Sequence, residues 1–526
     1  MAAVTKYVSN FLSRGGALAP LGVVTQVRHG GGGPILPPHK GRAHPADAPS
    51  WAQTAGAPIR QGLKNYYIYN ELKDVAEALP KEVPFAHKVL IVGGGCGGMA
   101  VARNLARKFG EGRIAIIDPA EHHYYQPAWT LVGAGQYNMA DTRYKISHMV
   151  PKKIKLYKAA VTEFVPDENH VLTDKFGKIK YDFLVVATGI KIDWDEVKGL
   201  KEAMGRDGVT TNYSPNFCEL THKMIRGVKK GTAIFTMPPA NRIKCPGAPQ
   251  KIMYLAEEIW RTEMGVRDNV NIKFITANPG QFAVKKYADS LNKICDERGL
   301  ERTYKSNLIA IDPDKREATF KRVGEGSDGS TFTERYSFIH VSPPMSPPDV
   351  VKKSPLANEA GFVDVHPTTM IHTKYANVFG IGDCTSVPTS KTAAAAAVEA
   401  YAVCENVFGA STAHTLHGHY DGYASCPLVV SKNQCIMAEF NAFTGEPWET
   451  FPIDQGKPSY LMHFMKKYVL PVIYWEAMMR GIWHGPGLFR EAFAWLPPFL
   501  TAKKVQWVMK DSQERAREQA PAAASA

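Results

Sequence analysis

The sequence predicts an α/β protein with two Rossmann-like domains and an amphipathic C-terminal region. Three observations predict this class. A strand, a glycine-rich loop and a helix follow one another over residues 88–109, and a similar succession recurs over 231–261. A third strand runs into a glycine turn and an acidic residue at 375–383, before an alanine-rich helix. Short apolar strands that alternate with helices are typical of parallel sheets covered by helices.

The first of these units has the pattern expected for an adenine dinucleotide. Lys88–Val92 is a short apolar run, and Gly93, Gly95 and Gly98 then give G-x-G-x-x-G at the start of a helix. The glycines permit a tight turn and a close approach of the backbone to pyrophosphate, which the helix N-terminus also favours. Asp118 follows Gly98 by 20 residues, at the end of the next strand, where an acidic side chain would bind ribose hydroxyls.

The second unit keeps the strand and the helix but lacks the glycine pattern. We predict a strand over Gly231–Met237 and a helix over about 250–261. A proline-rich loop between them holds Cys245, at the place where a pyridine-nucleotide enzyme would carry its glycines. The sequence therefore predicts one bound dinucleotide, with a thiol in place of a second.

The third unit indicates that this dinucleotide is FAD. Tyr375–Asp383 reads Y-A-N-V-F-G-I-G-D, which resembles the pattern with which glutathione-reductase-like flavoproteins hold the flavin ribityl chain through the aspartate. Leu184–Gly189 (L-V-V-A-T-G) resembles the crossover motif at which their FAD domain gives way to the next domain. The alternative for Asp383 is an ordinary turn or N-cap carboxylate.

Eight cysteines without a C-x-x-C pair predict neither a disulfide framework nor a metal site, so a working pair has to be assembled by the fold. Cys245 follows Lys244 and precedes a helix N-terminus, and both features lower a thiol pKa. Cys426 lies in a segment interpreted as an exposed turn. Cys295 and Cys404 are expected to be inert packing residues in helices. The residues alone leave the pairing of Cys245 with Cys426 open, and they single out no redox role for the others, Cys96, Cys218, Cys384 and Cys435.

Several long segments resemble the mitochondrial sulfide:quinone oxidoreductases. They are N-R-I-K-C-P-G-A-P-Q-K-I-M-Y-L at 241–255, V-S-P-P-M-S-P-P-D-V at 341–350, F-G-I-G-D-C-T-S-V-P-T-S-K-T-A-A-A at 379–395 and D-G-Y-A-S-C-P-L-V at 421–429. The segment at 118–135 resembles them too, and the resemblance extends from about residue 86 to 500. Relatives more often have serine at position 96 and glutamate at position 118.

The resemblance implies that hydrogen sulfide is oxidised, that the sulfane sulfur passes to glutathione or sulfite, and that ubiquinone takes the electrons. It implies a catalytic pair of Cys245 and Cys426 and favours Cys245 as the persulfide carrier, a choice that the residues alone do not decide. Lys391 is expected to place positive charge near the flavin, the alternative being a solvated lysine. The noncovalent FAD is expected to contact Cys96, Gly97, Asp118, Gln126, Val161, Asp383, Lys391, Thr392, Ala393 and Ala394.

The two ends of the chain predict a mitochondrial membrane protein. Residues 1–46 contain five Lys and Arg but no Asp or Glu, which indicates a transit peptide within 1–60, the alternative being a disordered basic tail. Residues 459–507 hold four of the nine tryptophans amid apolar and cationic residues, without an apolar run long enough to span a bilayer. We therefore expect this region to lie on the matrix side of the inner membrane. The alternative is a dimer interface or a pair of core helices.

The predicted division is an FAD-binding domain in two parts (86–207 and 340–430), a second Rossmann-like domain (208–339) and a membrane-associating region (431–526). No aromatic and basic stripe indicates nucleic-acid binding. Two other functions fit parts of this plan. A single-subunit NADH:quinone oxidoreductase would need a second glycine fingerprint, and residues 236–247 offer one glycine. A non-catalytic flavoprotein would serve as a docking or sulfur-carrier module.

Overall fold

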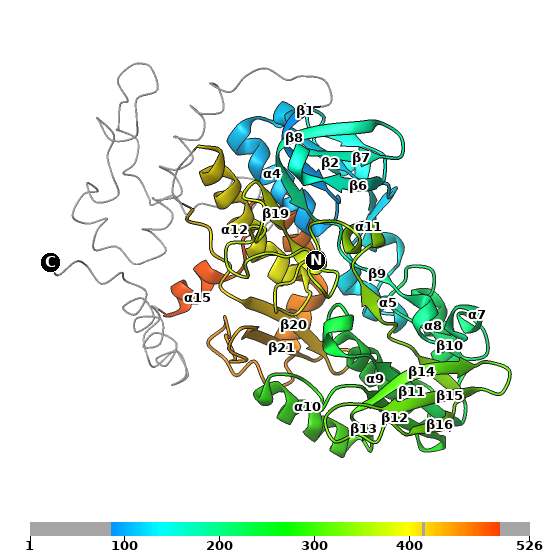
Figure 1. Ribbon diagram of the computed structural model, residues 1–526. Coiled ribbons are helices and arrows are strands. Elements are labelled where there is room, and N and C mark those ends of the chain that lie inside the picture. Colours follow the sequence, from blue (N-terminus) through cyan, green and yellow to red (C-terminus); the bar gives the residue numbers. More distant parts are fainter. Residues whose placement is uncertain (1–85, 413–415, 495–526) are drawn as a thin grey trace, which may run out of the picture.

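The computed structural model describes residues 86–412 and 416–494, so the predicted transit peptide lies outside the described residues (Figure 1). The first sheet has seven strands, six of them in the order β5-β2-β1-β8-β7-β6, with β19 paired to β8. Their bounds are β1 Ala86–Val92, β2 Ile114–Ile117, β5 Lys155–Tyr157, β6 Val161–Val165, β7 His170–Thr173, β8 Gly177–Val186 and β19 Val378–Gly380.

The centre of this sheet is parallel and buried, as its apolar strands predict. β1 pairs in parallel with both β2 and β8, and helix α4 (Cys96–Phe109) follows β1 directly. β19 pairs in parallel with β8, with Val378 opposite Leu184. This pairing brings the strand–turn–acid motif at 375–383 back to the sheet that carries the glycine loop.

The second sheet consists of five parallel strands in the order β10-β17-β11-β12-β13. Strand β11 (Gly231–Met237) has the predicted bounds, and the predicted helix after it, α9, runs from Ala248 to Glu258 before a π-helical turn (Ile259–Glu263). The α/β class with two Rossmann-like sheets is therefore confirmed. The other strands are β10 Val209–Thr210, β12 Val270–Thr276, β13 Glu301–Thr303 and β17 Phe338–His340, with an antiparallel sheet of β14 Ser306–Asp312, β15 Glu317–Arg322 and β16 Thr331–Arg335 beside them.

Shorter elements connect and cover the sheets. Cys295 and Cys404 are fully buried in helices α10 and α12, as expected of packing residues. The connecting and covering helices are α5 Trp129–Gly133, α6 Ile146–Met149, α7 Leu200–Ala203, α8 Cys218–Gly227, α10 Lys285–Glu297, α11 Asp349–Lys352 and α12 Ala393–Ser411. Two short strand pairs accompany them: β3 (His122–Tyr124) pairs with β4 (Arg143–Lys145), and β9 (Lys191–Ile192) pairs with β18 (Met345–Ser346).

A two-stranded hairpin corrects the expectation for Cys426. Strands β20 (Tyr423–Val429) and β21 (Cys435–Asn441) pair in antiparallel fashion, with Cys426 opposite Ala438. The interpretation of this segment as an exposed turn is wrong, since Cys426 is buried in mid-strand. The apolar run that contains it packs with α9 and α12, which outweighs the turn signal of the flanking glycine and proline. The predicted domain boundary at 430/431 falls in the turn of this hairpin.

The described part of the C-terminal region is helical and irregular. Helix α13 (Tyr460–Phe464) continues through a π-helical turn (465–469) into α14 (Leu470–Ile473), and a second π-helical turn follows (474–478). Helix α15 (Gly487–Ala494) comes after a break, at the edge of the fold in Figure 1. Within residues 86–412 and 416–494, every helix is too short or too polar to cross a bilayer.

Candidate active site

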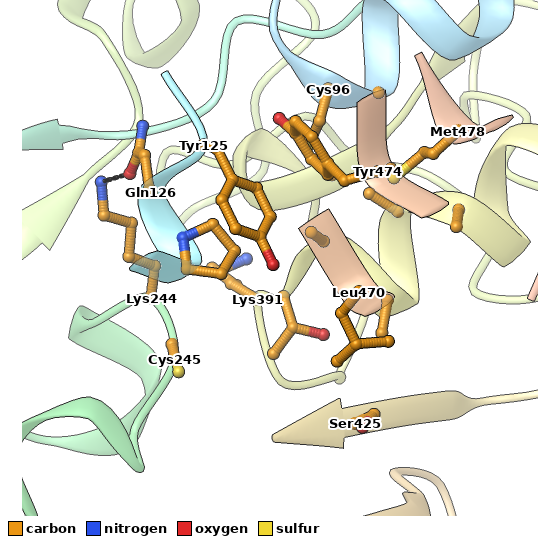
Figure 2. Close-up of a pocket in the computed structure, with 18 of the residues that line it drawn as sticks. Cys96, Tyr125, Gln126, Lys244, Cys245, Lys391, Ser425, Leu470, Tyr474 and Met478 are labelled. Carbon is orange, nitrogen blue, oxygen red and sulfur yellow. Dashed lines mark hydrogen bonds between the residues drawn. The ribbon is translucent and has the colours of Figure 1, made fainter. Parts of the chain in front are cut away.

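One cavity of about 670 Å³ joins the parts of the chain that the sequence singled out. It begins at the glycine loop after β1 and extends past the loop that holds Cys245 and the hairpin residue Cys426. The C-terminal helices close another side through side chains such as Leu470 and Tyr474 (Figure 2). A single space thus connects a dinucleotide loop, two thiols and the amphipathic helices.

Two positions of the glycine loop, Gly93 and Gly98, leave no room for a side chain. Gly93 has φ +109°, and a Cβ atom there would lie 2.3 Å from the Ala187 carbonyl oxygen. A Cβ at Gly98 would lie 1.9 Å from the Gly93 carbonyl oxygen, so Gly98 allows α4 to pack against the loop. A Cβ at Gly95 would have no protein atom within 4 Å, which leaves this edge open to the cavity. The open edge at the N-terminus of α4 fits a pyrophosphate.

Asp118 supports this loop from the end of β2. Its Oδ2 accepts a hydrogen bond from the backbone N–H of Gly94 at 2.6 Å, and its Oδ1 accepts one from Ala120 at 2.7 Å. Burial raises the pKa of Asp118, against the effect of these two bonds. Asp118 lines the cavity next to the glycine loop, where an acidic side chain can bind ribose hydroxyls.

Two alanine substitutions in the glycine loop are expected to have separable effects. Gly98→Ala places a methyl group against the Gly93 carbonyl oxygen. The variant should have a lower melting temperature, because the backbone cannot move enough to remove this clash. Gly95→Ala should leave the melting temperature of the flavin-free protein nearly unchanged but weaken FAD retention, because the methyl group enters the pyrophosphate space. Thermal unfolding of the apoprotein and flavin titration separate the two effects. Equal loss of apoprotein stability in both variants would contradict this account of the loop.

Most predicted cofactor residues line the cavity: Gly93, Gly95, Cys96, Gly97, Asp118, Gln126, Asp383, Lys391, Thr392, Ala393 and Ala394. Gly98 is instead a packing residue between α4 and the loop. Val161 begins β6 at the edge of the first sheet and lies outside the cavity lining. The cavity therefore does not extend to the position at which the resemblance implied a contact with Val161.

Asp383 and Lys391 lie together near the start of α12. Burial raises the pKa of Asp383 and lowers that of Lys391, while the charge of each counteracts the shift of the other. The Lys391 ammonium donates to the Thr385 carbonyl oxygen at 3.1 Å and lies 4.5 Å from the centre of the Phe362 ring, so this lysine is partly buried and not merely solvated. Thr392 caps α12 by accepting a hydrogen bond from the backbone N–H of Ala395.

The cavity brings together two thiols that lie 181 residues apart in the chain. The Sγ atoms of Cys245 and Cys426 are 3.5 Å apart, and a further approach of about 1.5 Å would allow a disulfide. Cys245 has φ +48°, a left-handed conformation that is rare for a residue other than glycine. Its backbone N–H donates to the Lys391 carbonyl oxygen at 3.0 Å, which ties the thiol loop to the start of α12.

The surroundings make the two thiols chemically unequal. A hydrogen bond donated by Cys426 lowers the pKa of Cys245 well below its ordinary value, and the nearby ammonium groups of Lys251 and Lys466 add to this effect. Lys251 Nζ lies 3.4 Å from the Cys245 sulfur. The pKa of Cys426 is raised well above the ordinary value by its interaction with Cys245 and by burial. Of the two sulfurs, Cys245 is therefore the one whose thiolate form the surroundings favour.

The cation in contact with Cys245 is not the one that the sequence indicated. Lys244, the chain neighbour, directs its ammonium to Gln126 Oε1, as the dashed line in Figure 2 shows. Lys251 faces the sulfur because the loop turns into α9, whose first turn places this lysine beside Cys245. The short spacing from Cys245 to a lysine in the first helical turn was the signal available in the sequence.

Two further residues reach the site from the C-terminal helices. Lys466 is buried, donates to the Pro127 carbonyl oxygen at 2.9 Å, and has its pKa lowered to about 8 by burial and by Lys251. The Tyr474 hydroxyl lies 2.6 Å from His123 Nε2, and His123 Nδ1 lies 3.2 Å from the Gly94 carbonyl oxygen. Because a carbonyl oxygen only accepts, His123 donates from Nδ1 and accepts the tyrosine hydroxyl at Nε2. This chain of bonds ties the glycine loop to the C-terminal helix.

Two Rossmann-like sheets, a dinucleotide loop and a facing pair of cysteines define a flavin-dependent disulfide oxidoreductase. The family described as pyridine nucleotide-disulphide oxidoreductase matches residues 87–217. The mitochondrial sulfide:quinone oxidoreductase of Mus musculus is 44% identical over 407 residues, 77% of this chain and 89% of the relative. That of Dictyostelium discoideum is 46% identical over 76% of this chain and 87% of the relative. The chain belongs to the sulfide:quinone oxidoreductase family, as the sequence motifs indicated.

The fold is also found in a solved bacterial structure. The crystal structure of the sulfide:quinone oxidoreductase from Aquifex aeolicus superposes with a TM-score of 0.66 at 22% identity, covering 76% of this chain and 93% of that chain. At this identity the likeness concerns the fold. It agrees with the arrangement of two Rossmann-like sheets described above.

Proposed function

We propose that this protein oxidises hydrogen sulfide and passes two electrons through noncovalently bound FAD to ubiquinone. The observation that carries this proposal is the approach of Cys245 and Cys426 to 3.5 Å in the cavity that begins at the dinucleotide loop. Membership of the sulfide:quinone oxidoreductase family supports the same reaction. It also favours this enzyme over an NADH:quinone oxidoreductase and over a non-catalytic carrier.

The unequal thiols suggest which sulfur is attacked. In the oxidised protein, hydrosulfide attacks one sulfur of the Cys245–Cys426 disulfide, and the other leaves as a thiolate. The thiol of lower pKa leaves faster, so Cys245 is the better leaving group and Lys251 stabilises its charge. The persulfide then forms on Cys426, which reverses the assignment that the sequence resemblance favoured.

The remaining steps close the cycle on this chain's own residues. A nucleophile such as sulfite or glutathione removes the sulfane sulfur and leaves Cys426 as a thiolate. The Cys245 and Cys426 thiolates then lose two electrons, and the disulfide re-forms. FAD, when bound, supplies the acceptor for these two electrons and hands them on to the quinone. Lys391 and the N-terminus of α12 line the cavity and would place positive charge beside a bound flavin, which gains negative charge on reduction.

Stopped-flow mixing of the FAD-loaded protein with sulfide tests this function. Sulfide together with sulfite should bleach the flavin absorbance, because both thiolates are free only after the sulfane sulfur has left, and a short-chain ubiquinone should restore it. NADH should leave the absorbance unchanged. Bleaching by NADH, or no response to sulfide, would overturn the proposal. Alkylation after a single sulfide addition, followed by peptide mass spectrometry, locates the persulfide on Cys426 or Cys245.

We propose in addition that the C-terminal helices lie on the matrix face of the mitochondrial inner membrane. Tyr460, Leu461 and Phe464 are exposed on α13, and Leu488 and Phe489 are exposed on α15. Leu470, Ile473 and Phe489 also line the cavity, so the same helices offer a lipid-soluble quinone an apolar approach to the site. The mitochondrial relatives support the organelle, and the short helices are compatible with a peripheral position.

Acidic substitutions on α13 test the membrane contact. The double substitution Leu461→Asp and Phe464→Asp should abolish most binding to cardiolipin-containing vesicles, since each buried side chain contributes about 1.5–3 kcal/mol. Turnover with a water-soluble quinone should change little. Phe176→Asp is a matched control, because Phe176 is equally exposed before β8 in another part of the molecule. If the control and the double variant float with the vesicles to the same extent, α13 is not part of the membrane-binding surface.

A further inference from the structure

Three buried side chains on one flank of the cavity have polar atoms that find no partner among residues 86–412 and 416–494. They are Trp129 Nε1, Thr130 Oγ1 and both side-chain atoms of the Asn212 amide. Each side chain is at least nine-tenths buried, and each lines the cavity. Buried polar groups are almost always hydrogen-bonded, and leaving one unpaired is costly. Unpartnered atoms gathered on one wall of a cavity therefore point to a ligand that enters from the cavity.

The three side chains form one continuous wall. Trp129 and Thr130 begin α5, and Gly133 lies on the same helix face one turn later. The Asn212 amide packs on Gly133, where an added Cβ would lie 2.3 Å from Asn212 Oδ1. Glycine at position 133 thus makes room for the Asn212 amide beside Trp129 and Thr130.

This wall adjoins the thiol pair. Tyr213, next to Asn212 in the chain, donates its hydroxyl to the Cys245 carbonyl oxygen at 3.3 Å. Lys244, the residue before Cys245, holds its ammonium 5.5 Å from the centre of the Trp129 ring. The wall therefore adjoins the loop that holds Cys245, and Figure 2 shows Lys244 and Cys245 projecting from this same loop.

The chemistry of the wall selects an anion. Trp129 Nε1 can only donate, the Asn212 amide offers two N–H groups, and Lys244 adds a positive charge. Among the described residues, the acidic side chains that line the cavity are Asp118, Asp383 and Glu439, which belong to the glycine loop, the turn before α12 and the hairpin. None of them lies on the elements that form this wall. The wall thus presents hydrogen-bond donors and, through Lys244, a positive charge that Asp383 partly balances, which fits a ligand whose oxygens carry negative charge.

We infer that Trp129, Thr130 and Asn212 form the binding subsite for the sulfur acceptor, a small nucleophile that carries an oxyanion group. This inference rests on the proposed function. Sulfite fits through its own oxygens, and a thiol such as glutathione fits through a carboxylate. With sulfite, the sulfur lone pair attacks the sulfane sulfur of the Cys426 persulfide, the sulfur–sulfur bond to Cys426 breaks, and the cysteine keeps the electron pair as a thiolate. Thiosulfate leaves, and no outside oxidant or reductant is needed for this transfer.

Steady-state kinetics of the FAD-loaded Asn212→Leu and Thr130→Val variants test the subsite. Each variant should raise the KM for sulfite and for glutathione about tenfold, the ordinary effect of leaving a charged ligand without one hydrogen bond. Cyanide is a sulfur acceptor without an oxyanion group, so its KM should stay within about twofold of the unsubstituted protein. The flavin content should be unchanged, and so should the rate of bleaching by sulfide when cyanide is the acceptor.

Several outcomes would overturn the subsite. Unchanged KM values for sulfite and glutathione would remove its basis. An equal rise for cyanide would indicate a general disturbance of the cavity, and loss of flavin would assign these atoms to the cofactor. If Asn212→Leu does not fold, Thr130→Val alone decides, because its side chain keeps nearly the same volume. Failure of the unsubstituted protein to respond to sulfide would instead refute the proposed function, so the two failures are distinguishable.

Discussion

The Cys245→Ser variant is expected to bind FAD and to show no flavin bleaching by sulfide. Without the Cys245 sulfur there is no disulfide for hydrosulfide to attack, and a serine hydroxyl cannot replace it as a leaving group. The loss should be on the order of a thousandfold or more, as expected when the reacting group itself is removed. Stopped-flow absorbance at a series of sulfide concentrations measures it, with flavin content determined on the same sample.

A second cysteine substitution serves as the control for this result. Cys404 is fully buried in α12, and its Sγ lies 3.8 Å from the Val101 carbonyl oxygen, outside the cavity lining. Cys404→Ser should lower thermal stability but keep the bleaching rate per bound flavin. Normal bleaching in Cys245→Ser would remove the thiol pair from the mechanism altogether.

Lys251→Met is expected to raise the pKa of Cys245 and to slow turnover about 10- to 100-fold near neutral pH. Lys251 Nζ lies 3.4 Å from the Cys245 sulfur, and its positive charge favours the thiolate over the thiol. The folded-state pKa of Cys245 is depressed, so in the unsubstituted protein the thiolate is present above that low pKa and is lost only as the pH falls through it. In the variant the thiolate should appear at higher pH, and activity should recover as the pH rises.

Alkylation of the reduced protein by iodoacetamide measures this shift directly, because only the thiolate reacts. The rate plotted against pH should move to higher pH in Lys251→Met. Lys244→Met is the matched control, since the Lys244 ammonium is bonded to Gln126 and should shift the profile much less. A larger shift of the pH profile in the Lys244 variant than in the Lys251 variant would show that Lys244, and not Lys251, lowers the pKa of Cys245.

Local chemistry explains what the sequence predicted well. Strand β11 and the glycine loop could be located because an apolar strand and a G-x-G-x-x-G turn each depend on adjacent residues. The burial of Cys426 could not be inferred in this way. Its flanking Gly422 and Pro427 are typical of turns, whereas pairing with β21, far from any local signal, determines the structure.

The parts of the site that the sequence missed depend on long-range packing. Lys466 reaches the thiols from a helix more than 200 residues after Cys245, and the π-helical turn that holds it leaves no clear periodicity in the sequence. Tyr474, which contacts His123, also lies in a π-helical turn far from its partner in the sequence, so this contact could not be predicted either. Lys251 was within reach of sequence reasoning, because it already lies in the first turn of the helix predicted over about 250–261.

The location of the two sulfurs affects the thermal stability of the protein during its cycle. Cys245 belongs to a loop of the second Rossmann-like unit, and Cys426 belongs to the hairpin across the cavity. A covalent bond between them closes a very long loop, and such closure is worth up to about 5 kcal/mol through the entropy of the unfolded chain. In the proposed cycle, the oxidised protein would be cross-linked across its own cavity, and each molecule of sulfide would open this cross-link until turnover re-forms it. The melting temperature should therefore fall when sulfide is supplied and rise again when turnover has consumed it.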